Sequence, residues 1–187
     1  MNDVLTRTII NDIDVSALGE VVEQIAADPA NARVRFSVAT RWTGQTGSVS
    51  TVKGYDIAGE HVAREFEIIA DEPRELLGTN TAPNPQELLM SALNACMTVG
   101  YVAGAAIRGV TLDKLEIETT GQLDLRGFLG LDSSVPAGYE TLDYVVHISG
   151  NGTAEQFADI HRTVMATSPN YFNMARPIAM NGRLSID

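Results

Sequence analysis

The apolar run between Asn84 and Gly109 constrains the fold more than any other segment of the chain. Asn84 is a favoured helix N-cap, Pro85 suits the first helical position, and Glu87 stands three residues after Asn84, as in a capping box. Gly109 is a natural left-handed terminator, and Arg108 suits the negative end of the helix dipole. The pattern predicts one long helix from Asn84 to about Arg108.

Apolar residues cover nearly every side of this predicted helix. They are Leu88, Leu89, Ala92, Leu93, Ala95, Cys96, Val99, Val102, Ala103, Ala106 and Ile107. A helix that is apolar all round is expected to be buried, so we expect it to be central to the domain or to a dimer. It also carries Cys96, the only cysteine of the chain.

Hydrophobic periodicity predicts that strands and two further helices surround this helix. A helix is predicted over 14–28, and another begins at Thr153 and Gln156 and reaches Ser168, where Pro169 stops it and a short turn follows. Strands are predicted over 33–42, 48–55, 62–70, 115–125, 139–149 and 178–186. The order lacks βαβ alternation, which indicates an α+β fold rather than a doubly wound sheet.

The first predicted strand, 33–42, has two unlike faces. Its apolar side chains are Val34, Phe36, Val38 and Trp42, and its basic ones are Arg33, Arg35 and Arg41. Because alternate side chains of a strand point to opposite faces, this pattern predicts a half-buried strand with a basic face turned to solvent or to a cleft.

Length and charge limit the classes of function. The 187 residues suit one domain, predicted over 33–187, with a helical N-terminal extension over 1–32. A net charge of −11 disfavours nucleic acid and anionic membranes as partners. No run of apolar residues suggests a transmembrane segment, no signal peptide is evident, and one cysteine cannot form an internal disulfide. We therefore expect a soluble cytoplasmic protein.

Two interpretations of Cys96 remain open at this stage. A buried free cysteine is often inert packing, but a placed thiol can also act as a nucleophile. The reactive species is the thiolate, which burial disfavours and a nearby cation favours. The start of its own helix is roughly 18 Å away, too far for the dipole to help. A reactive Cys96 therefore needs a cation from elsewhere, with Arg41, Arg176 and Arg35 as candidates.

The sequence gives no pattern typical of a metal or cofactor site. His61, His147 and His161 lie on different predicted elements and have no metal-ligand spacing, and a single cysteine rules out a thiolate-rich zinc site. No phosphate-binding glycine loop or dinucleotide fingerprint is present. We therefore expect neither a metal nor a cofactor.

Several motifs, taken in order, resemble the OsmC/Ohr superfamily over residues 33–187. They are Gly78-Thr79-Asn80, the run from Asn84-Pro85-Gln86-Glu87 to Cys96, Asp124-Leu125-Arg126-Gly127-Phe128, and Ala166-Thr167-Ser168-Pro169. The resemblance implies an OsmC-like α+β fold, with antiparallel-rich sheets packed around two long central helices in an intertwined homodimer. It also implies active sites at the subunit interface and peroxiredoxin-like reduction of hydroperoxides by cysteine thiols.

The resemblance places Cys96 at the peroxidatic cysteine, but the usual partners differ. Ser168 stands where the family has its second cysteine, and Gln86 stands where it has a glutamate. The turn that should hold an activating arginine, 43–47, has none, and Arg41 is the nearest substitute. Because a serine cannot form a disulfide, the resemblance implies at most one-cysteine chemistry, in which the oxidised Cys96 needs an external thiol or the other subunit's Cys96.

The sequence therefore leaves three functions open. The first is an OsmC-like homodimer of the oxidative-stress type that reduces organic peroxides through Cys96. The alternative is a catalytically eroded OsmC-fold dimer that binds a small apolar or anionic molecule in the interface cleft. The third is an interaction protein in which residues 1–32 dock a partner or cover the cleft.

Overall fold

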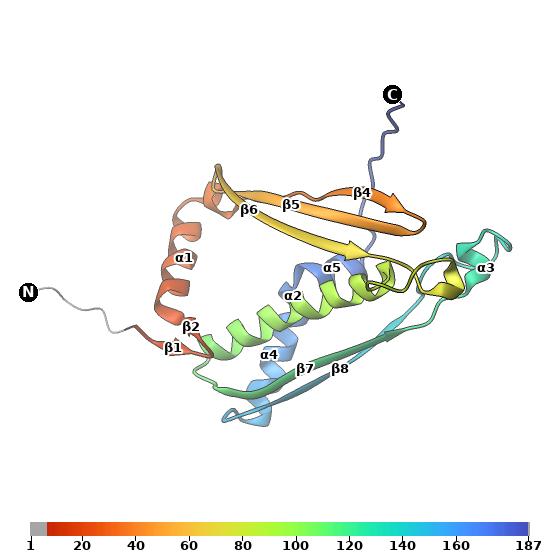
Figure 1. The fold of residues 1–187 in the computed structure, drawn as a ribbon. Helices are drawn as coiled ribbons and strands as arrows, with labels where there is room; N and C mark the ends of the chain where they lie inside the picture. The colour runs from red at the N-terminus through yellow and green to blue at the C-terminus, as the bar shows by residue number, and fades with distance from the viewer. Residues whose placement is uncertain (1–6, 187) are drawn as a thin grey trace, which may run out of the picture. The chain divides into compact units, whose positions relative to one another are not determined.

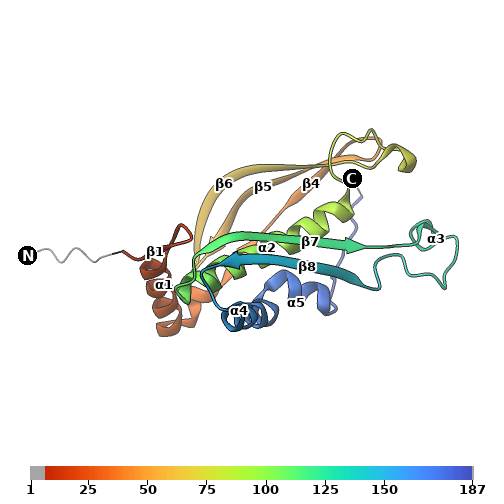
Figure 2. The ribbon, with the colours of Figure 1, turned by 90° about the horizontal axis from the view of Figure 1, so that it is seen from below.

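The computed structural model describes residues 7–186, which form two compact units. The first unit ends at Ser91 and the second begins at Ala92, so the division falls within the long helix α2 (Pro85–Ile107). Figures 1 and 2 show the elements from two directions. Each unit is described by itself below.

The first unit opens with a short hairpin and a helix. Strands β1 (Ile9–Ile10) and β2 (Ile13–Asp14) pair antiparallel and lead into α1 (Val15–Ala27). The side chain of Asp14 caps α1 by accepting a hydrogen bond from the Ala17 amide at 3.0 Å, and the short helix η1 (Pro29–Ala32) follows. The helix predicted over 14–28 is confirmed. Residues 1–6 of the predicted N-terminal extension lie outside the described residues. The predicted boundary between the extension (1–32) and the domain (33–187) stays a prediction.

An antiparallel sheet follows, with β5 (Gly47–Ile57) at its centre. One edge of β5 pairs with β6 (Glu60–Ala70). The other edge pairs with β3 (Val34–Phe36) and β4 (Ala39–Gly44), which bind different segments of β5. The prediction of one strand over 33–42 is therefore wrong: the strand is interrupted after Phe36, and the two later strand predictions are confirmed.

One face of this sheet is apolar and uncovered. Strand pairing places the side chains of Trp42, Val52, Phe66 and Ile68 on the same face, called here the apolar sheet face. Trp42 and Phe66 of this face are 76% and 58% exposed. Phe36, on the other face, is 68% exposed, so the predicted half-burial of 33–42 is also wrong within a single chain. The buried hydrophobic residues of the described chain all lie in the second unit.

A buried carboxylate, Asp71, fixes the loop after β6. Its Oδ1 accepts from the Thr46 hydroxyl at 2.8 Å and the Glu72 amide at 2.9 Å. Its Oδ2 accepts from the amide and hydroxyl of Thr79, at 2.9 and 2.5 Å, and from those of Thr81, both at 3.2 Å. These bonds join the β4–β5 turn to the loop that contains the short helix η2 (Arg74–Leu76) and leads to α2.

We expect Asp71 to make the first unit sensitive to acid. Hydrogen bonds, the largest from Thr79, hold the pKa of Asp71 well below its usual range, although burial opposes this. Since the folded pKa is lower than the unfolded value of about 3.9, the stabilisation is present above that pH and declines as the pH falls further. Urea midpoints between pH 2 and 5 measure this decline, which Asp71→Asn should flatten.

The exposed Asp113, replaced by asparagine, is the matched control for this experiment. Asp113→Asn should leave the pH dependence of the urea midpoint unchanged. If Asp71→Asn and the parent lose stability in parallel below pH 4, the carboxylate of Asp71 is not the group responsible.

Helix α2 begins and ends as its sequence predicts. The Asn84 amide donates to Glu87 Oε2 and the Glu87 amide donates to Asn84 Oδ1, both at 2.8 Å, which completes the capping box. Gly109 has a φ of 70°, a left-handed conformation that glycine adopts without strain. Arg108 Nη1 donates to the Gly104 carbonyl at 3.1 Å, so its charge lies at the negative end of the helix.

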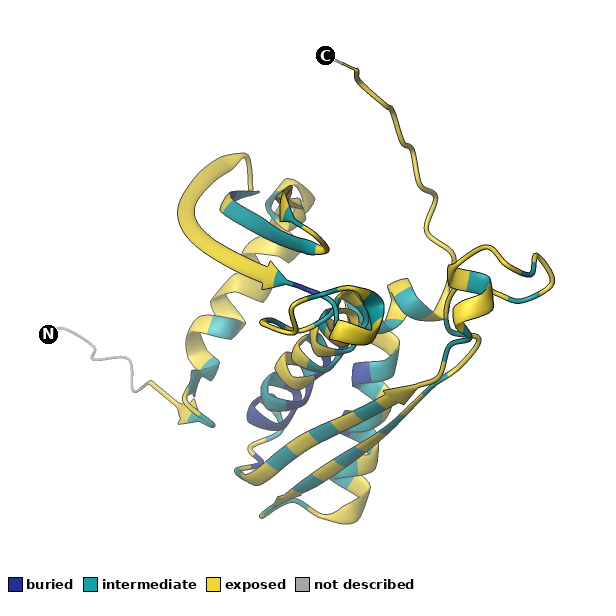
Figure 3. Ribbon diagram, turned by 45° about the vertical axis from the view of Figure 1, so that its right-hand side comes forward, coloured by how far each residue is buried: buried dark blue, intermediate teal, exposed yellow. Residues whose placement is uncertain are grey.

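The second unit holds the hydrophobic core. The part of α2 from Ala92 onward packs with the antiparallel pair β7 (Leu112–Gly121) and β8 (Leu142–Gly150) and with α4 (Ala154–Thr167). Burial alternates along β7 and β8, visible as stripes in Figure 3. The fully buried members of the core are Leu93, Met97, Tyr101, Ala105, Val110, Ile160 and Val164. The strands predicted over 115–125 and 139–149 are confirmed with shifted bounds.

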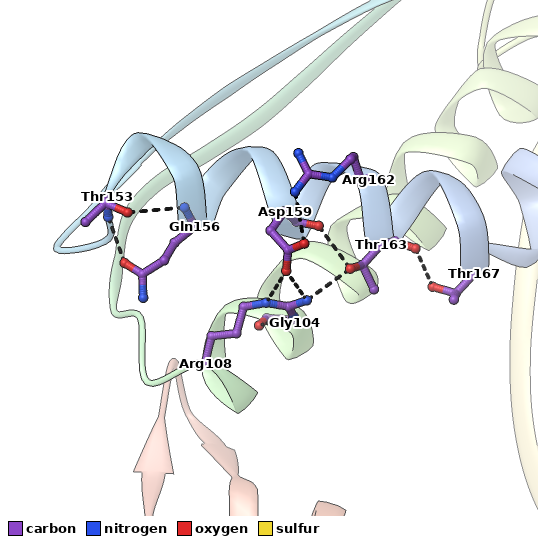
Figure 4. A network of polar contacts seen from close by, with 8 residues as sticks. All are labelled: Gly104, Arg108, Thr153, Gln156, Asp159, Arg162, Thr163 and Thr167. Carbon is purple, nitrogen blue, oxygen red and sulfur yellow. Dashed lines mark hydrogen bonds and ion pairs between the residues drawn. The ribbon is translucent and has the colours of Figure 1, made fainter.

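Polar contacts join the end of α2 to α4 (Figure 4). Arg108 donates to Asp159 Oδ2 from Nε at 2.9 Å and from Nη2 at 2.6 Å, and to the Thr163 hydroxyl at 3.0 Å. Arg162 also donates to Asp159, at 3.1 Å, and the Arg108 bonds lower the pKa of Asp159 most. Thr153 and Gln156 form the predicted capping box at the start of α4. The network therefore fixes the end of α2 against α4.

The loop between β7 and β8 contains a further motif of the sequence. The Asp124 side chain caps α3 (Leu125–Phe128) by accepting from the Arg126 amide at 2.9 Å. A Cβ atom on Gly127 would lie 2.2 Å from the Pro136 carbonyl oxygen, so a side chain at this position would displace the backbone. Glycine within this motif is therefore required by close packing inside the loop.

Three predictions about the rest of the chain need correction. The predicted strand over 178–186 is absent from this described segment, which is extended and unpaired, with Met180 87% exposed. Pro169 ends α4 as predicted, but it begins a further helix, α5 (Pro169–Ala175), rather than a turn. Burial of α2 on every side is wrong for a single chain, because Val99 and Ile107 are 69% and 59% exposed, and its burial in a dimer stays a prediction.

Length and hydropathy alone would let α2 cross a membrane, which the sequence analysis did not anticipate. The helix has 23 residues and a mean hydropathy of 1.5 over its most apolar window. The core helix of a globular domain passes the same test. Six residues of α2 from Leu93 to Ala106 are buried within the second unit, which fits a core helix.

Candidate functional site

Cys96 and Ser168, 72 residues apart in the sequence, meet inside the second unit. The Ser168 hydroxyl donates a hydrogen bond to Cys96 Sγ at 3.4 Å. Ser168 is 5% exposed, whereas Cys96 is only half-buried in the middle of α2. The serine is therefore fixed in the interior while the sulfur keeps some access to solvent.

The junction between α4 and α5 positions the Ser168 hydroxyl. The Ser168 amide donates to the Val164 carbonyl at 2.8 Å and ends α4. The Ser168 hydroxyl accepts from the Tyr171 amide at 3.4 Å and so caps α5, whose first residue is Pro169. Because the hydroxyl oxygen accepts from α5, its single hydrogen is free to point at the sulfur of Cys96.

Polar side chains on either side anchor the turn of α2 that carries Cys96. Asn94 donates to the Ile117 carbonyl of β7 at 3.1 Å and accepts from the Thr119 hydroxyl at 2.6 Å. Asn170 of α5 donates to the Ala92 carbonyl at 2.8 Å. These residues were not among the predicted site residues. The signal was Asn94 itself, a polar residue on an otherwise apolar stretch of helix.

The remaining predicted site residues belong to the first unit. Arg41 lies exposed on β4 opposite Val49, and Gln86 lies half-buried in the first turn of α2. The structure brings together Cys96 and Ser168 but does not place Arg41 or Gln86 in the same compact unit.

No guanidinium bonds to Cys96 within the described part of the second unit. Arg176, another candidate cation, lies over the Phe172 ring at 4.8 Å. Ser168 is the partner that the structure gives to the sulfur of Cys96.

The arrangement favours chemistry at one sulfur atom. A hydroxyl that donates to the sulfur holds the sulfur atom in a fixed orientation and can also bond to an oxygen added to it. The hydroxyl cannot itself close a disulfide. Among residues 7–186, no group of three or more histidine, cysteine, aspartate or glutamate side chains is placed to hold a metal ion.

The three histidines are engaged separately. His61 Nδ1 lies 2.8 Å from Asp56, His147 lies 3.9 Å from Glu118, and His161 bonds to the hydroxyl of Tyr101. None of them contacts Cys96 or Ser168 within the described residues, so none serves as a base for the thiol in this structure.

Comparison with protein families gives one match that includes the site. The family model described as OsmC-like protein matches residues 78–181, which is more than half of the chain and contains both Cys96 and Ser168. Comparison with curated proteins gives no match.

Solved structures share the fold at low sequence identity. An OsmC-like protein from Mycoplasma pneumoniae is 15% identical, with a TM-score of 0.60 over 75% of this chain and 87% of that one. A putative osmotic stress induced and detoxification response protein from Psychrobacter arcticus is 16% identical, with a TM-score of 0.56 over 72% and 85%. An OsmC-like protein of unknown function from Vibrio cholerae is 15% identical, with a TM-score of 0.51 over 74% and 92%. These similarities establish the fold, α+β with antiparallel sheets.

Proposed function

Because the chain belongs to the OsmC-like protein family, we propose that it reduces organic hydroperoxides by one-cysteine chemistry at Cys96. The observation that carries the proposal is the hydrogen bond of 3.4 Å from the Ser168 hydroxyl to Cys96 Sγ. It places a fixed donor at the sulfur, at the position where the sequence resemblance expects a second cysteine.

The proposed reaction has three balanced steps. The Cys96 thiolate attacks the outer oxygen of the hydroperoxide, the O–O bond breaks, and the electron pair leaves on an alkoxide that takes a proton to become the alcohol. Cys96 is thereby oxidised to a sulfenic acid. An external thiol condenses with the sulfenic acid and releases water, and a second thiol reduces the mixed disulfide and restores Cys96.

Ser168 has a defined role in this scheme. Its donor hydrogen holds the sulfur in a fixed orientation before attack and can bond to the sulfenic acid afterwards. Because it lacks a sulfur atom, it cannot capture the oxidised cysteine as a disulfide. The sulfenic acid therefore persists until an external thiol reacts with it, and this thiol reaches the half-buried Cys96 from solvent.

Replacing the thiol tests the proposal directly. We expect Cys96→Ser to lower the rate of cumene hydroperoxide consumption at least a hundredfold in the presence of a small-molecule thiol, because the serine hydroxyl is not a competent nucleophile here. Stopped-flow kinetics measure the rate, and mass spectrometry of the parent detects one added oxygen on Cys96. Equal rates for the parent and Cys96→Ser would sink the proposal.

A second candidate function is non-catalytic binding of a small apolar or anionic molecule. One observation favours it: in the described part of the second unit, the sulfur of Cys96 bonds to a neutral hydroxyl and to no guanidinium. This function predicts slow alkylation of Cys96 at pH 6. Rapid labelling by iodoacetamide at that pH contradicts it and supports the thiol chemistry.

We further propose a cytoplasmic homodimer. The apolar sheet face supports the dimer, because its two aromatic side chains, Trp42 and Phe66, are more than half exposed. The unpaired segment 176–186 is exposed throughout and has apolar side chains at alternate positions, with Leu184 and Ile186 83% and 86% exposed. A second copy of the chain would cover such surfaces. A reducing cytoplasm would supply the thiols, and the charge of −11 disfavours nucleic acid and membranes as partners.

A charge placed on the apolar sheet face tests the dimer. We expect Phe66→Asp to shift the sedimentation equilibrium towards monomer at least tenfold, because an unpaired carboxylate would be buried in the interface. Ile69→Asp is the matched control, since Ile69 is 56% exposed on the opposite face of β6 and should leave the equilibrium unchanged. If Phe66→Asp and the parent sediment alike, the apolar sheet face is not the interface.

A further inference from the structure

A cavity lies between β8 and α4 in the second unit and does not include Cys96. Its volume is about 470 Å³, within the range of small-molecule sites. Tyr144, Val146, Ile148 and Phe157 give it apolar walls, and Tyr101 and His161 are the polar groups that line it. An apolar cavity with a few fixed polar groups is the usual form of a small-ligand site.

The polar pair in this cavity is fixed by a hydrogen bond. The hydroxyl of Tyr101, a residue only 1% exposed, bonds to His161 Nδ1. Burial, aided by the neighbouring Tyr144, raises the pKa of Tyr101 to about 12, so the phenol keeps its proton near neutral pH. A phenol that donates this hydrogen to Nδ1 leaves the ring hydrogen of His161 on Nε2.

Nε2 of His161 has no hydrogen-bond partner among residues 7–186. Among residues 7–186, the one buried side-chain nitrogen or oxygen atom without a hydrogen-bond partner is Glu72 Oε2, in the first unit. Nε2 of His161 is therefore not a buried atom. The donor on Nε2 is therefore accessible. The ring is held in place by Tyr101 and Tyr144, whose ring centroids lie 6.1 and 6.5 Å from its own.

The charges near His161 leave it available to an anion. Asp159, two residues earlier on α4, is ion-paired with Arg108 at 2.6 Å and with Arg162 at 3.1 Å. His147 of β8 lies on the opposite face of the strand from Tyr144 and Val146, and its nearby carboxylate is Glu118. The side chain of His161 is thus paired with a neutral phenol, and a ligand can supply the missing acceptor.

We propose that this cavity binds a small carboxylic acid with an apolar body, whose carboxylate accepts a hydrogen bond from His161 Nε2 while its hydrocarbon packs on Tyr144, Val146, Ile148 and Phe157. A carboxylate suits the site better than a neutral oxygen, because a charged acceptor forms the stronger hydrogen bond with Nε2. The site is independent of the thiol chemistry proposed for Cys96.

Calorimetric titration with octanoate and with octan-1-ol tests the ligand class on the parent protein. The two probes have the same chain length and differ in the head group. We expect octanoate to bind at least about tenfold more tightly, as a charge-assisted hydrogen bond predicts. The imidazole ¹⁵N signal of Nε2 in His161 should shift with octanoate and not with octan-1-ol. Equal affinities overturn the proposal, because they indicate adsorption to apolar surface alone.

Variants locate the head group. His161→Leu should abolish the preference for octanoate and leave the affinity for octan-1-ol unchanged, whereas His147→Leu on the other face of β8 should preserve the preference. Tyr101→Phe removes the bond that fixes the tautomer and should reduce the preference without abolishing it. A preference that persists in His161→Leu overturns the proposal. If His161→Leu does not fold, the ¹⁵N shift in the parent decides the question by itself.

Discussion

Replacing Ser168 by cysteine is expected to give a protein that closes a disulfide with Cys96 after one equivalent of hydroperoxide. The Ser168 oxygen already lies 3.4 Å from Cys96 Sγ, and a disulfide needs the two sulfurs about 2.05 Å apart. A small rotation of the two side chains covers that difference. Since 72 residues separate the two positions, the closed loop should stabilise the folded state by about 2–4 kcal/mol.

Thiol titration measures this result. The reduced Ser168→Cys variant should show two thiols, and the oxidised variant none, with a mass loss of about 2 Da that reflects the two hydrogens removed. A dithiol should then sustain peroxide turnover through this intramolecular disulfide, whereas turnover of the parent passes through a mixed disulfide with the external thiol. The reduced variant should be about 0.5–2 kcal/mol less stable than the parent, because a thiol is a poor substitute for the hydroxyl that caps α5.

The double variant Cys96→Ser with Ser168→Cys is the matched control. It keeps one thiol at the α4–α5 junction and should form no intramolecular disulfide. Two thiols that persist in oxidised Ser168→Cys, or disulfides that form only between chains, would show that the approach of Cys96 to Ser168 is not maintained in solution.

Truncation of Met97 is expected to give the largest loss of stability among these substitutions. Met97 follows Cys96 on α2, is completely buried, and belongs to the core with Tyr101, Ile160 and Val164. Met97→Ala removes most of a core side chain and leaves a cavity that the packed helices fill only in part. We expect the free energy of unfolding to fall by about 2–5 kcal/mol.

Urea denaturation followed by far-ultraviolet circular dichroism measures that change. Val99→Ala is the control on the same helix, because Val99 is 69% exposed and should change the free energy of unfolding by less than about 0.5 kcal/mol. Similar effects of the two substitutions would contradict the burial of the Met97 face of α2. They would also remove the basis for a fixed Cys96 sulfur.

Local signals in the sequence predicted the helices well. The bounds of α2 depend on Asn84, Pro85 and Glu87 at its start and on Gly109 at its end, and each of these acts on backbone groups only a few residues away. The start of α4 likewise depends on Thr153 and Gln156. Such signals operate before any tertiary contact forms, so a single sequence contains them in full.

Strands and burial were predicted less well, because they depend on distant partners. The apolar alternation over 178–186 is typical of a strand, yet no neighbouring strand pairs with it in the structure. The apolar face over 33–42 suggested half-burial, but nothing among the described residues covers Phe36 or Trp42. A strand needs a second segment to satisfy its backbone, and periodicity alone does not say whether that segment exists.

The sequence by itself determined the long helix, the position of Cys96 on it, and the resemblance that marks Ser168 as the substitute for a second cysteine. Only the tertiary structure decided that the Ser168 hydroxyl donates to the sulfur, and that Asn94, Thr119 and Asn170 fix the surrounding turn. The physical reason is the range of the interactions. Helix caps join residues a few positions apart, whereas a hydrogen bond across 72 residues exists only after α2, α4 and α5 have packed together.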